Sequence, residues 1–567
     1  MIEVVLYRLY VLCYKHWWKL TALLVILVAA GLRLYQLGAV PHGLAWDEAA
    51  IGYNGYAIFT THSDEWLQRL PLSFKSFGDY KAPFAIYLNG IFTYFLGMKI
   101  WVVRLPFALA GIAAVAGIMA LTSEVLPAAV VKLKRQWLVL LSGIILTLSP
   151  WHFHYSRVAF ESGIALSLLI WGVYFLLKVL AQTPNKPLLK LLYPLSASLL
   201  LSLSMYTYHS AKFMVPATIG VLLLFFWKKT LHRQWHFWLF MTSILVFLIP
   251  LVYDHIYGTG SSRMVQASVL NAGYSLPQIL LMTLNGFMAH LKLSFLLQGE
   301  TINFRHGDGQ WGVLFITTFL MVGLGIFRWL HEVVSFVSSK SHTIDSDNLK
   351  FLTFSLLWVL FGLTPAAIGV DLPHSNRALL ALPGLIWLAI AGVDWLSTWL
   401  QQQPLNRTWK GSQGQANYLV KVVLGSLVLW SGLLSTSYFH HYFTEYASIS
   451  ADDFKDGYVE AMSEAVKHEQ GTAEYRKVDQ IIFSSLNGQP YIYALFVRRT
   501  NPIWYQGGSL NNFLFTDKIR SSDLDRPNTL VVSTAEDQIL TAVPTKIIYG
   551  GDDEPKFYLY LTEPAQP

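Results

Sequence analysis

The sequence has 567 residues, of which 54% are hydrophobic and only 13% are charged. Soluble domains carry about 25% charged residues, so the composition excludes a wholly soluble protein and places most of the chain in lipid. The net charge of +7 comes from Lys and Arg in short loops between apolar runs, and we therefore expect no nucleic-acid partner. Cys13 is the only cysteine, which excludes an intrachain disulfide and a cysteine-based metal site.

Apolar runs long enough to cross a bilayer as helices recur from residue 20 to about residue 438. The first run, Leu20–Leu32, follows a basic start and resembles a signal sequence. Arg33 and Gln36 follow it in place of a small-residue cleavage site, so we interpret this run as a retained first span.

Loops rich in Lys and Arg indicate the cytoplasmic side of the membrane. Five such loops contain Lys132, Lys134 and Arg135; Lys186 and Lys190; Lys228, Lys229 and Arg233; Arg328, Lys340 and Lys350; and Arg407, Lys410 and Lys421. We expect these loops and the N-terminus to be cytoplasmic, which requires an even number of spans before Lys132.

Three apolar segments lie before Lys132, near 20–37, 83–97 and 102–122, so one of them cannot cross. The segment Ala82–Gly97 is the shortest and contains Asn89 and Gly90. We predict that it lies in the outer interface and that about eleven transmembrane helices remain.

The outward-facing connections are then 38–101, 151–161, 206–212, 254–310 and 371–376, with the tail from 439 also outside. Apolar residues at roughly helical spacing predict juxtamembrane helices at Trp46–Thr60 and Pro277–Leu297. The sequence thus predicts a membrane domain at 1–440, which includes the first outer loop 38–101 and a later outer loop 254–310.

Residues 441–567 have the composition of a soluble domain, and we expect a small α/β domain that lies on the extracytoplasmic face. We expect a helix at Asp452–His468 and strands at Val478–Phe483, Thr529–Ser533, Thr545–Tyr549 and Phe557–Leu561. The pattern leaves helix and strand open for Tyr491–Val497.

Two polar clusters lie in the first outer loop. Asp47 and Glu48 follow Trp46, and such a pair either caps a helix N-terminus or supplies a general base for an acceptor hydroxyl. Lys81 precedes the non-spanning segment, where a lysine either extends toward lipid headgroups or binds a lipid phosphate beside an acidic site.

The later outer connections add further charges at the same surface. Glu161 follows a short loop that contains Ser149-Pro150-Trp151-His152 and Ser156-Arg157, and an acid at a membrane edge is costly unless it is paired or used. Cations recur in three successive connections, which indicates an anion site assembled from several spans; they are Lys212 with His209, Arg305 with His306, and Arg377 with His374.

Together these motifs resemble the family 39 type of glycosyltransferase, the superfamily of protein O-mannosyltransferases and aminoarabinose transferases. The match is in order as well as type: the acidic pair in the first outer loop, Lys81-Ala82-Pro83, Arg104-Leu105-Pro106, Ser-Pro-x-His before Ser-Arg, and Pro373-His374-x-x-Arg377. The resemblance covers residues 20 to about 440 and implies an all-α polytopic membrane protein with the GT-C fold.

The resemblance also implies an activity, which is inverting transfer of a sugar from a polyprenyl-phosphate-linked donor to a protein, lipid or glycan acceptor. Asp47 matches the position of the family's catalytic acid, so the resemblance implies that Asp47 is the general base. Glu48 or Glu161 would then orient the acceptor or the sugar. Lys81 matches the family's Lys-Pro element. Arg305 and Arg377 correspond by loop order, and these three cations would bind the leaving phosphate with hydrogen bonds from His306 and His374.

A related family that transfers oligosaccharide to protein uses a divalent metal held by acids from two outer loops. Asp47 and Glu161 could imitate that arrangement, but hard cations require about six oxygen ligands, so we expect no obligatory metal. Two other functions stay open: a lipid-linked polysaccharide polymerase or ligase, and a lipid-linked sugar transporter or flippase. Either would also be a multi-pass protein of the cell membrane, in contact with membrane lipids.

Overall fold

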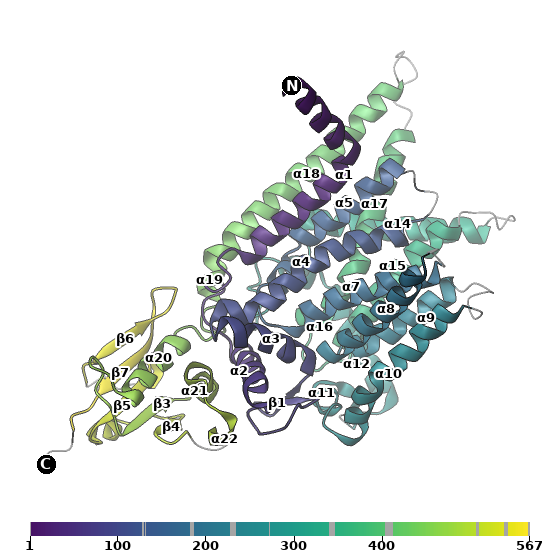
Figure 1. Cartoon of the computed structure of the whole chain (residues 1–567). Coiled ribbons are helices and arrows are strands. Elements are labelled where there is room, and N and C mark those ends of the chain that lie inside the picture. Colours follow the sequence, from purple (N-terminus) through teal and green to yellow (C-terminus); the bar gives the residue numbers. More distant parts are fainter. Residues whose placement is uncertain are drawn as a thin grey trace.

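The fold was analysed in a computed structural model, which describes residues 2–127, 130, 132–181, 186–226, 234–271, 273–338, 346–402, 412–505, 510–537 and 542–564. The chain forms a large helical bundle with a small mixed α/β domain at one end (Figure 1). This division agrees with the fold class that the sequence predicts.

Nine helices in the described part of the chain are long and apolar enough to cross a membrane. They lie in α1 (Ile2–Leu34), α4 (Ile100–Val125), α7 (Glu161–Leu180), α8 (Pro187–Thr207), α10 (Trp235–Tyr257), α14 (Ile316–Ser338), α15 (Ser346–Ala367), α17 (Leu382–Gln402) and α18 (Ser412–Phe443). Two shorter helices run beside them in the bundle, α5 (Lys132–Leu148) and α9 (Ala211–Phe226) (Figure 1). With these two, the bundle contains the number of helices that hydropathy predicts.

The segment that we predict not to span is helix α3 (Pro83–Leu96), which has 14 residues. At 1.5 Å per residue it is about 21 Å long, short of the roughly 30 Å hydrocarbon core. It packs against helix α2 (Trp46–Thr61), and their backbones nearly touch where Gly55 faces Gly90. A Cβ on Gly90 would lie 2.4 Å from the carbonyl oxygen of Gly55, so only glycine permits this approach.

Short elements complete the end of the bundle that carries the C-terminal domain. A two-stranded hairpin, β1 (Phe74–Ser76) and β2 (Asp79–Lys81), follows α2. The segment expected to be one helix at Pro277–Leu297 divides at Lys292 into α12 (Leu276–Leu291) and α13 (Leu293–Gln298). The remaining elements are α6 (Pro150–Tyr155), α11 (Ser262–Ala267), α16 (Ser375–Ala378) and two 3-10 turns, η2 (Val269–Asn271) and η3 (Leu379–Ala381).

The C-terminal domain contains a five-stranded sheet in the order β4-β3-β5-β7-β6. Strands β3 (Gln480–Ser484), β5 (Thr529–Thr534), β6 (Lys546–Tyr549) and β7 (Pro555–Leu561) occupy the four runs that the sequence predicts, and β4 (Phe513–Thr516) is an edge strand that it misses. The pairs β3–β4 and β3–β5 are parallel, and β7 pairs antiparallel with β5 and β6.

Helix α20 (Tyr458–Gln470) packs against β3, β5 and β7, and α21 (Pro490–Arg498) packs against α20, with the short helix α22 (Pro502–Tyr505) after it. Helix α19 (Glu445–Ile449) instead contacts the end of α18, and its buried residues Tyr446 and Ala447 belong to the core of the bundle. The 3-10 turns η4 (Ser521–Asp525) and η5 (Ala535–Asp537) connect strands. Helix α20 begins six residues later than predicted because Gly457, at φ +81°, ends the preceding turn. The segment left open at 491–497 is helical, with Pro490 in its first turn.

The C-terminal domain packs directly on α2. Tyr53 of α2 donates a hydrogen bond to the carbonyl of Thr500 at 2.7 Å, and Tyr493 of α21 donates one to the carbonyl of Leu44 at 2.7 Å. Both tyrosines belong to a buried apolar cluster that continues from α2 into the sheet. The helix that carries the acidic pair is therefore held from both sides, by α3 and by the C-terminal domain.

The N-terminus and the C-terminal domain lie at opposite ends of the bundle (Figure 1). Six of the basic residues that we assign to cytoplasmic loops lie outside the described residues; they are Lys228, Lys229, Arg233, Lys340, Arg407 and Lys410.

Candidate active site

The N-terminus of α2 separates the two neighbouring acids. Glu48 is fully buried and caps the helix, since its Oε2 accepts a hydrogen bond from the Ala45 amide at 3.1 Å. The Arg104 guanidinium donates to both of its carboxylate oxygens at 2.9 Å, and the Ala159 amide donates to Oε1 at 2.8 Å. Glu48 therefore joins α2, α4 and the start of α7, and its side chain does not line the cavity described below.

Asp47, one residue earlier, points the other way into a cavity of about 930 Å³. Its Oδ1 lies 2.6 Å from Lys81 Nζ, and its Oδ2 lies 3.1 Å from Arg305 Nη1. Burial alone would raise the pKa of Asp47, but the positive charges of Lys81 and Arg305 outweigh burial and lower it. Asp47 is thus ionised and held by two cations from separate loops.

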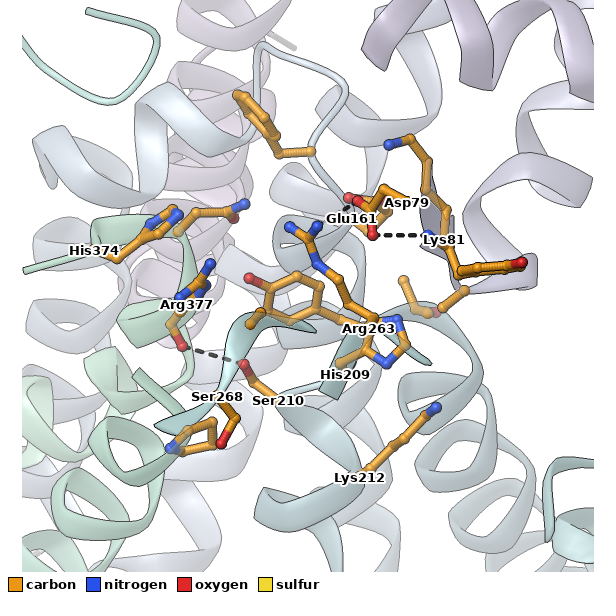
Figure 2. A pocket seen from close by; sticks show the side chains of 18 of the residues that line it. Asp79, Lys81, Glu161, His209, Ser210, Lys212, Arg263, Ser268, His374 and Arg377 are labelled. Atoms are coloured by element: carbon orange, nitrogen blue, oxygen red, sulfur yellow. Dashed lines mark hydrogen bonds and ion pairs between the residues drawn. The ribbon is translucent and has the colours of Figure 1, made fainter. Parts of the chain in front are cut away.

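Lys81 and Glu161 lie on the same side of the cavity. Lys81 ends strand β2, and its side chain is only 8% exposed. Burial alone would lower the pKa of Lys81. The negative charges of Asp47, Glu161 and Asp79 outweigh burial and raise this pKa above its ordinary value, so the lysine is charged. Glu161 is the first residue of α7 and lines the cavity close to Lys81 (Figure 2).

His374 and Arg377 form the facing wall (Figure 2). Arg377 Nη2 lies 3.2 Å from Asp371, a carboxylate whose side chain is 72% exposed, whereas its Nη1 has no hydrogen-bond partner among the described residues. The guanidinium fits because residue 369 is glycine: a Cβ there would lie 2.5 Å from Nη1.

His306 and His374 lie against each other at this wall, with ring centroids 4.8 Å apart. Burial lowers the pKa of His374 to about 3, and burial and the neighbouring His374 lower that of His306 well below its ordinary value. Both imidazoles are therefore neutral at neutral pH.

The cavity also contains residues that sequence reasoning does not single out. Arg263 of α11 forms a 2.5 Å ion pair with Asp79 and lies between Glu161 and Arg377 (Figure 2). Gln489 comes from the C-terminal domain, 442 residues after Asp47. No local pattern surrounds Arg263 or Gln489, so only the fold reveals them.

The predicted pair Lys212 and His209 also lines the cavity (Figure 2). Apolar side chains make up a further part of the wall. This part is formed by ends of α8, α9, α10 and α15 and includes Met205, Phe213, Leu251, Val252, Ile256 and Pro365. Val252 and Ile256 are 52% and 65% exposed on the side of α10, where the bundle would meet lipid. The cavity thus offers cations for an anion and apolar side chains for an apolar chain.

The sequence matches no protein-family model and no curated protein. Solved structures do resemble it. ArnT from Cupriavidus metallidurans in the apo state aligns with a TM-score of 0.50 and 11% identity, over 96% of this chain and 98% of ArnT. The same protein bound to undecaprenyl phosphate aligns with a TM-score of 0.51 and 11% identity, over 98% and 99%.

The chain has the GT-C fold. The archaeal oligosaccharyltransferase AglB from Archaeoglobus fulgidus aligns less completely, with a TM-score of 0.47 and 12% identity, over 86% of this chain and 64% of AglB. At 11% identity the similarity to ArnT establishes the fold, which here includes the C-terminal domain because the alignment covers nearly all of both chains.

Proposed function

We propose that this protein transfers a sugar from a polyprenyl-phosphate-linked donor to an acceptor hydroxyl on the extracytoplasmic face of the cell membrane, with inversion at the anomeric carbon. The observation that carries the proposal is Asp47 held between Lys81 and Arg305 in a cavity that is lined by both cations and apolar side chains. A polyprenyl phosphate combines a charged head with an apolar chain.

The two cations explain how donor binding prepares the base. The donor phosphate is an anion like Asp47, and it competes for Lys81 and Arg305 when it enters the cavity. Each cation that turns to the phosphate weakens its hold on Asp47, so the basicity of that carboxylate increases as the donor binds.

In the transfer step the acceptor oxygen forms a bond to the anomeric carbon while the bond from that carbon to the phosphate oxygen breaks. The acceptor proton passes to Asp47, and polyprenyl phosphate leaves with its charge compensated by Lys81, Arg305 and Arg377. Glu161 faces the same space and is assigned to orient the sugar or acceptor. Glu48 takes no part in our proposed chemistry, because its carboxylate is buried in contacts with Arg104.

The Lys- and Arg-rich loops support the extracytoplasmic orientation, because they predict a cytoplasmic N-terminus. Helices α2 and α11, which line the cavity, lie at the end of the bundle that carries the C-terminal domain, opposite the N-terminus (Figure 1). Cysteine labelling tests this: in a Cys13→Ser background, an impermeant reagent added outside should label Gly97→Cys and leave Lys134→Cys unlabelled. Labelling at position 134 would reverse the orientation.

Transfer itself is tested by incubating purified protein with radiolabelled polyprenyl-phosphate monosaccharides and a crude membrane extract as acceptor source. We expect Asp47→Asn to lower transfer by roughly 100-fold to 10,000-fold, the usual contribution of a general base. Asp517→Asn, an exposed acid in the C-terminal domain, should retain full activity. Full activity in Asp47→Asn, or no transfer by wild type from any donor, would reject the proposal.

A further inference from the structure

A second cluster lies beside the cavity, where three possible metal ligands converge from two outer loops. The ligand atoms of Glu300, His306 and His374 all lie within 4.8 Å of one another. Glu300 and His306 belong to the loop between α13 and α14, and His374 precedes α16. We propose that these three side chains bind one divalent transition-metal ion, with an open coordination position facing the cavity.

The donor set fits such an ion. Two imidazoles and one carboxylate are ligands that Zn²⁺ accepts in sites that keep a position for water or substrate, and Mn²⁺ and Co²⁺ accept the same ligands. Tetrahedral ligands at about 2.0–2.1 Å from a metal lie about 3.4 Å apart, so the side chains must approach each other by roughly an ångström. Both His306 and His374 line the cavity, so a metal ion bound to them would have one coordination position open to the cavity.

Each ligand is held by a neighbouring group that leaves a donor atom for the metal. Ser375 donates to Glu300 Oε1 from its amide at 2.5 Å and its hydroxyl at 2.6 Å, so both bonds use the same carboxylate oxygen. Tyr155 Oη lies 2.8 Å from His306 Nδ1, which assigns Nε2 to the metal. Such outer contacts orient the ligands of established metal sites.

His374 supplies the clearest sign that the cluster is incomplete without a ligand. Its Nδ1 is buried and has no hydrogen-bond partner among the described residues, although it lies 3.9 Å from Glu300 Oε1. The His374 backbone is fixed, since its amide donates to His290 Nε2 at 3.0 Å. A buried nitrogen without a partner is costly, and a metal bond would satisfy it.

Two neighbouring arginines oppose a cation at this place. Arg305 and Arg377 are close enough to disfavour protonation of His374, and the same field acts on a metal ion. A phosphate bound in the cavity would offset that charge, so metal and phosphate should each strengthen the binding of the other by the same factor. This coupling depends on the proposed function, whereas the metal site itself does not.

The test uses purified full-length protein with its affinity tag removed. We expect about one equivalent of Co²⁺ to bind with visible d–d absorption, and added undecaprenyl phosphate to tighten binding. Glu300→Gln and His374→Gln should weaken Co²⁺ binding at least about 100-fold, and Ser375→Ala, which removes only an orienting contact, about 10-fold. His255→Gln, which also lines the cavity, serves as the matched control and should bind Co²⁺ as wild type does.

The wild-type titration decides the matter even where a variant folds poorly. Absence of d–d absorption in wild type, or equal Co²⁺ binding by Glu300→Gln and His255→Gln, would overturn the metal site. If undecaprenyl phosphate does not tighten Co²⁺ binding, the coupling between metal and phosphate is overturned. Asp47→Asn should bind Co²⁺ normally, so inactive Asp47→Asn with intact metal binding separates this proposal from that of the transfer reaction.

Discussion

Lys81 Nζ lies 2.6 Å from Asp47 Oδ1, and this contact joins two short outer elements that each contribute one charge to the cavity. A carboxylate in this contact is a weaker base than it would be alone, because the lysine favours its ionised form. The pair therefore has two states in our proposal: closed on itself in the free protein, and opened by the donor phosphate.

The first prediction concerns the pH dependence of transfer. Lys81 is the strongest of the charges that lower the pKa of Asp47, so Lys81→Gln should raise that pKa. Because the base must be deprotonated in the free enzyme, the acidic limb of kcat/KM should move to higher pH, and the KM for the donor should rise. Profiles from pH 4 to 9 with a polyprenyl-phosphate sugar measure both effects.

Lys75→Gln is the matched control for Lys81→Gln. Lys75 is an exposed lysine of the same hairpin and lies over the Trp66 ring, away from Asp47. Its variant should keep the wild-type profile. An unchanged acidic limb in Lys81→Gln would show that Asp47 does not titrate as the catalytic base.

The second prediction separates the two adjacent acids. Glu48 and Arg104 are both fully buried, and removing one partner of a buried ion pair costs about 3–5 kcal/mol. Glu48→Gln should therefore lower the thermal midpoint and the yield of monodisperse protein in detergent, whereas Asp47→Asn should lower both by less, because the Asp47 side chain is 24% exposed. If Glu48→Gln is stable but inactive, Glu48 belongs to the chemistry after all.

The third prediction concerns the glycine contact under α2. A Cβ on Gly90 would lie 2.4 Å from Gly55 O and 2.5 Å from the Phe59 ring, so Gly90→Ala must separate α2 from α3. Overpacking of this kind costs about 1–3 kcal/mol and should also displace Asp47 from Lys81, lowering both the thermal midpoint and transfer. Gly323→Ala, in α14 with nothing within 4 Å of the added Cβ, should lower neither.

Sequence alone predicts the bundle well because hydropathy reports directly on burial in lipid, and lipid leaves few choices other than helices. The short segment at 82–97 is identifiable for the same reason, since charge counting and length agree on it. The predicted strands of the tail also coincide with the sheet, except the edge strand β4, whose four residues give little signal.

The site is harder to predict, because its geometry depends on residues far apart in the chain. Nothing in the Asp47-Glu48 dipeptide says which acid faces the cavity; Arg104, 56 residues later, captures Glu48 and leaves Asp47 free to meet Lys81. The Glu300 cluster is equally hidden, since it needs two loops to meet. Arg263 and Gln489 have no motif and enter the cavity only through the fold.

The last prediction concerns Glu65, a buried acid of the first outer loop. Its Oε1 accepts hydrogen bonds from Ser76 at 2.7 Å and Asn54 at 3.4 Å, and burial raises its pKa to about 7. Two charged groups influence the pKa of Glu65: Asp64 raises it and Lys81 lowers it. Glu65 in turn raises the pKa of three neighbouring tyrosines, Tyr53, Tyr491 and Tyr505.

Because an unfolded Glu has a pKa of about 4.3, the folded protein binds more protons than the unfolded one between about pH 4.3 and 7. The stability that Glu65 contributes is therefore complete below about pH 4.3 and is lost as the pH rises through 7. Glu65→Gln removes this dependence, so the fall in thermal midpoint between pH 5 and 8 should be smaller than in wild type. Glu474→Gln, an exposed acid, should preserve the wild-type fall. An equal fall in both variants would mean that Glu65 is already ionised in the folded protein.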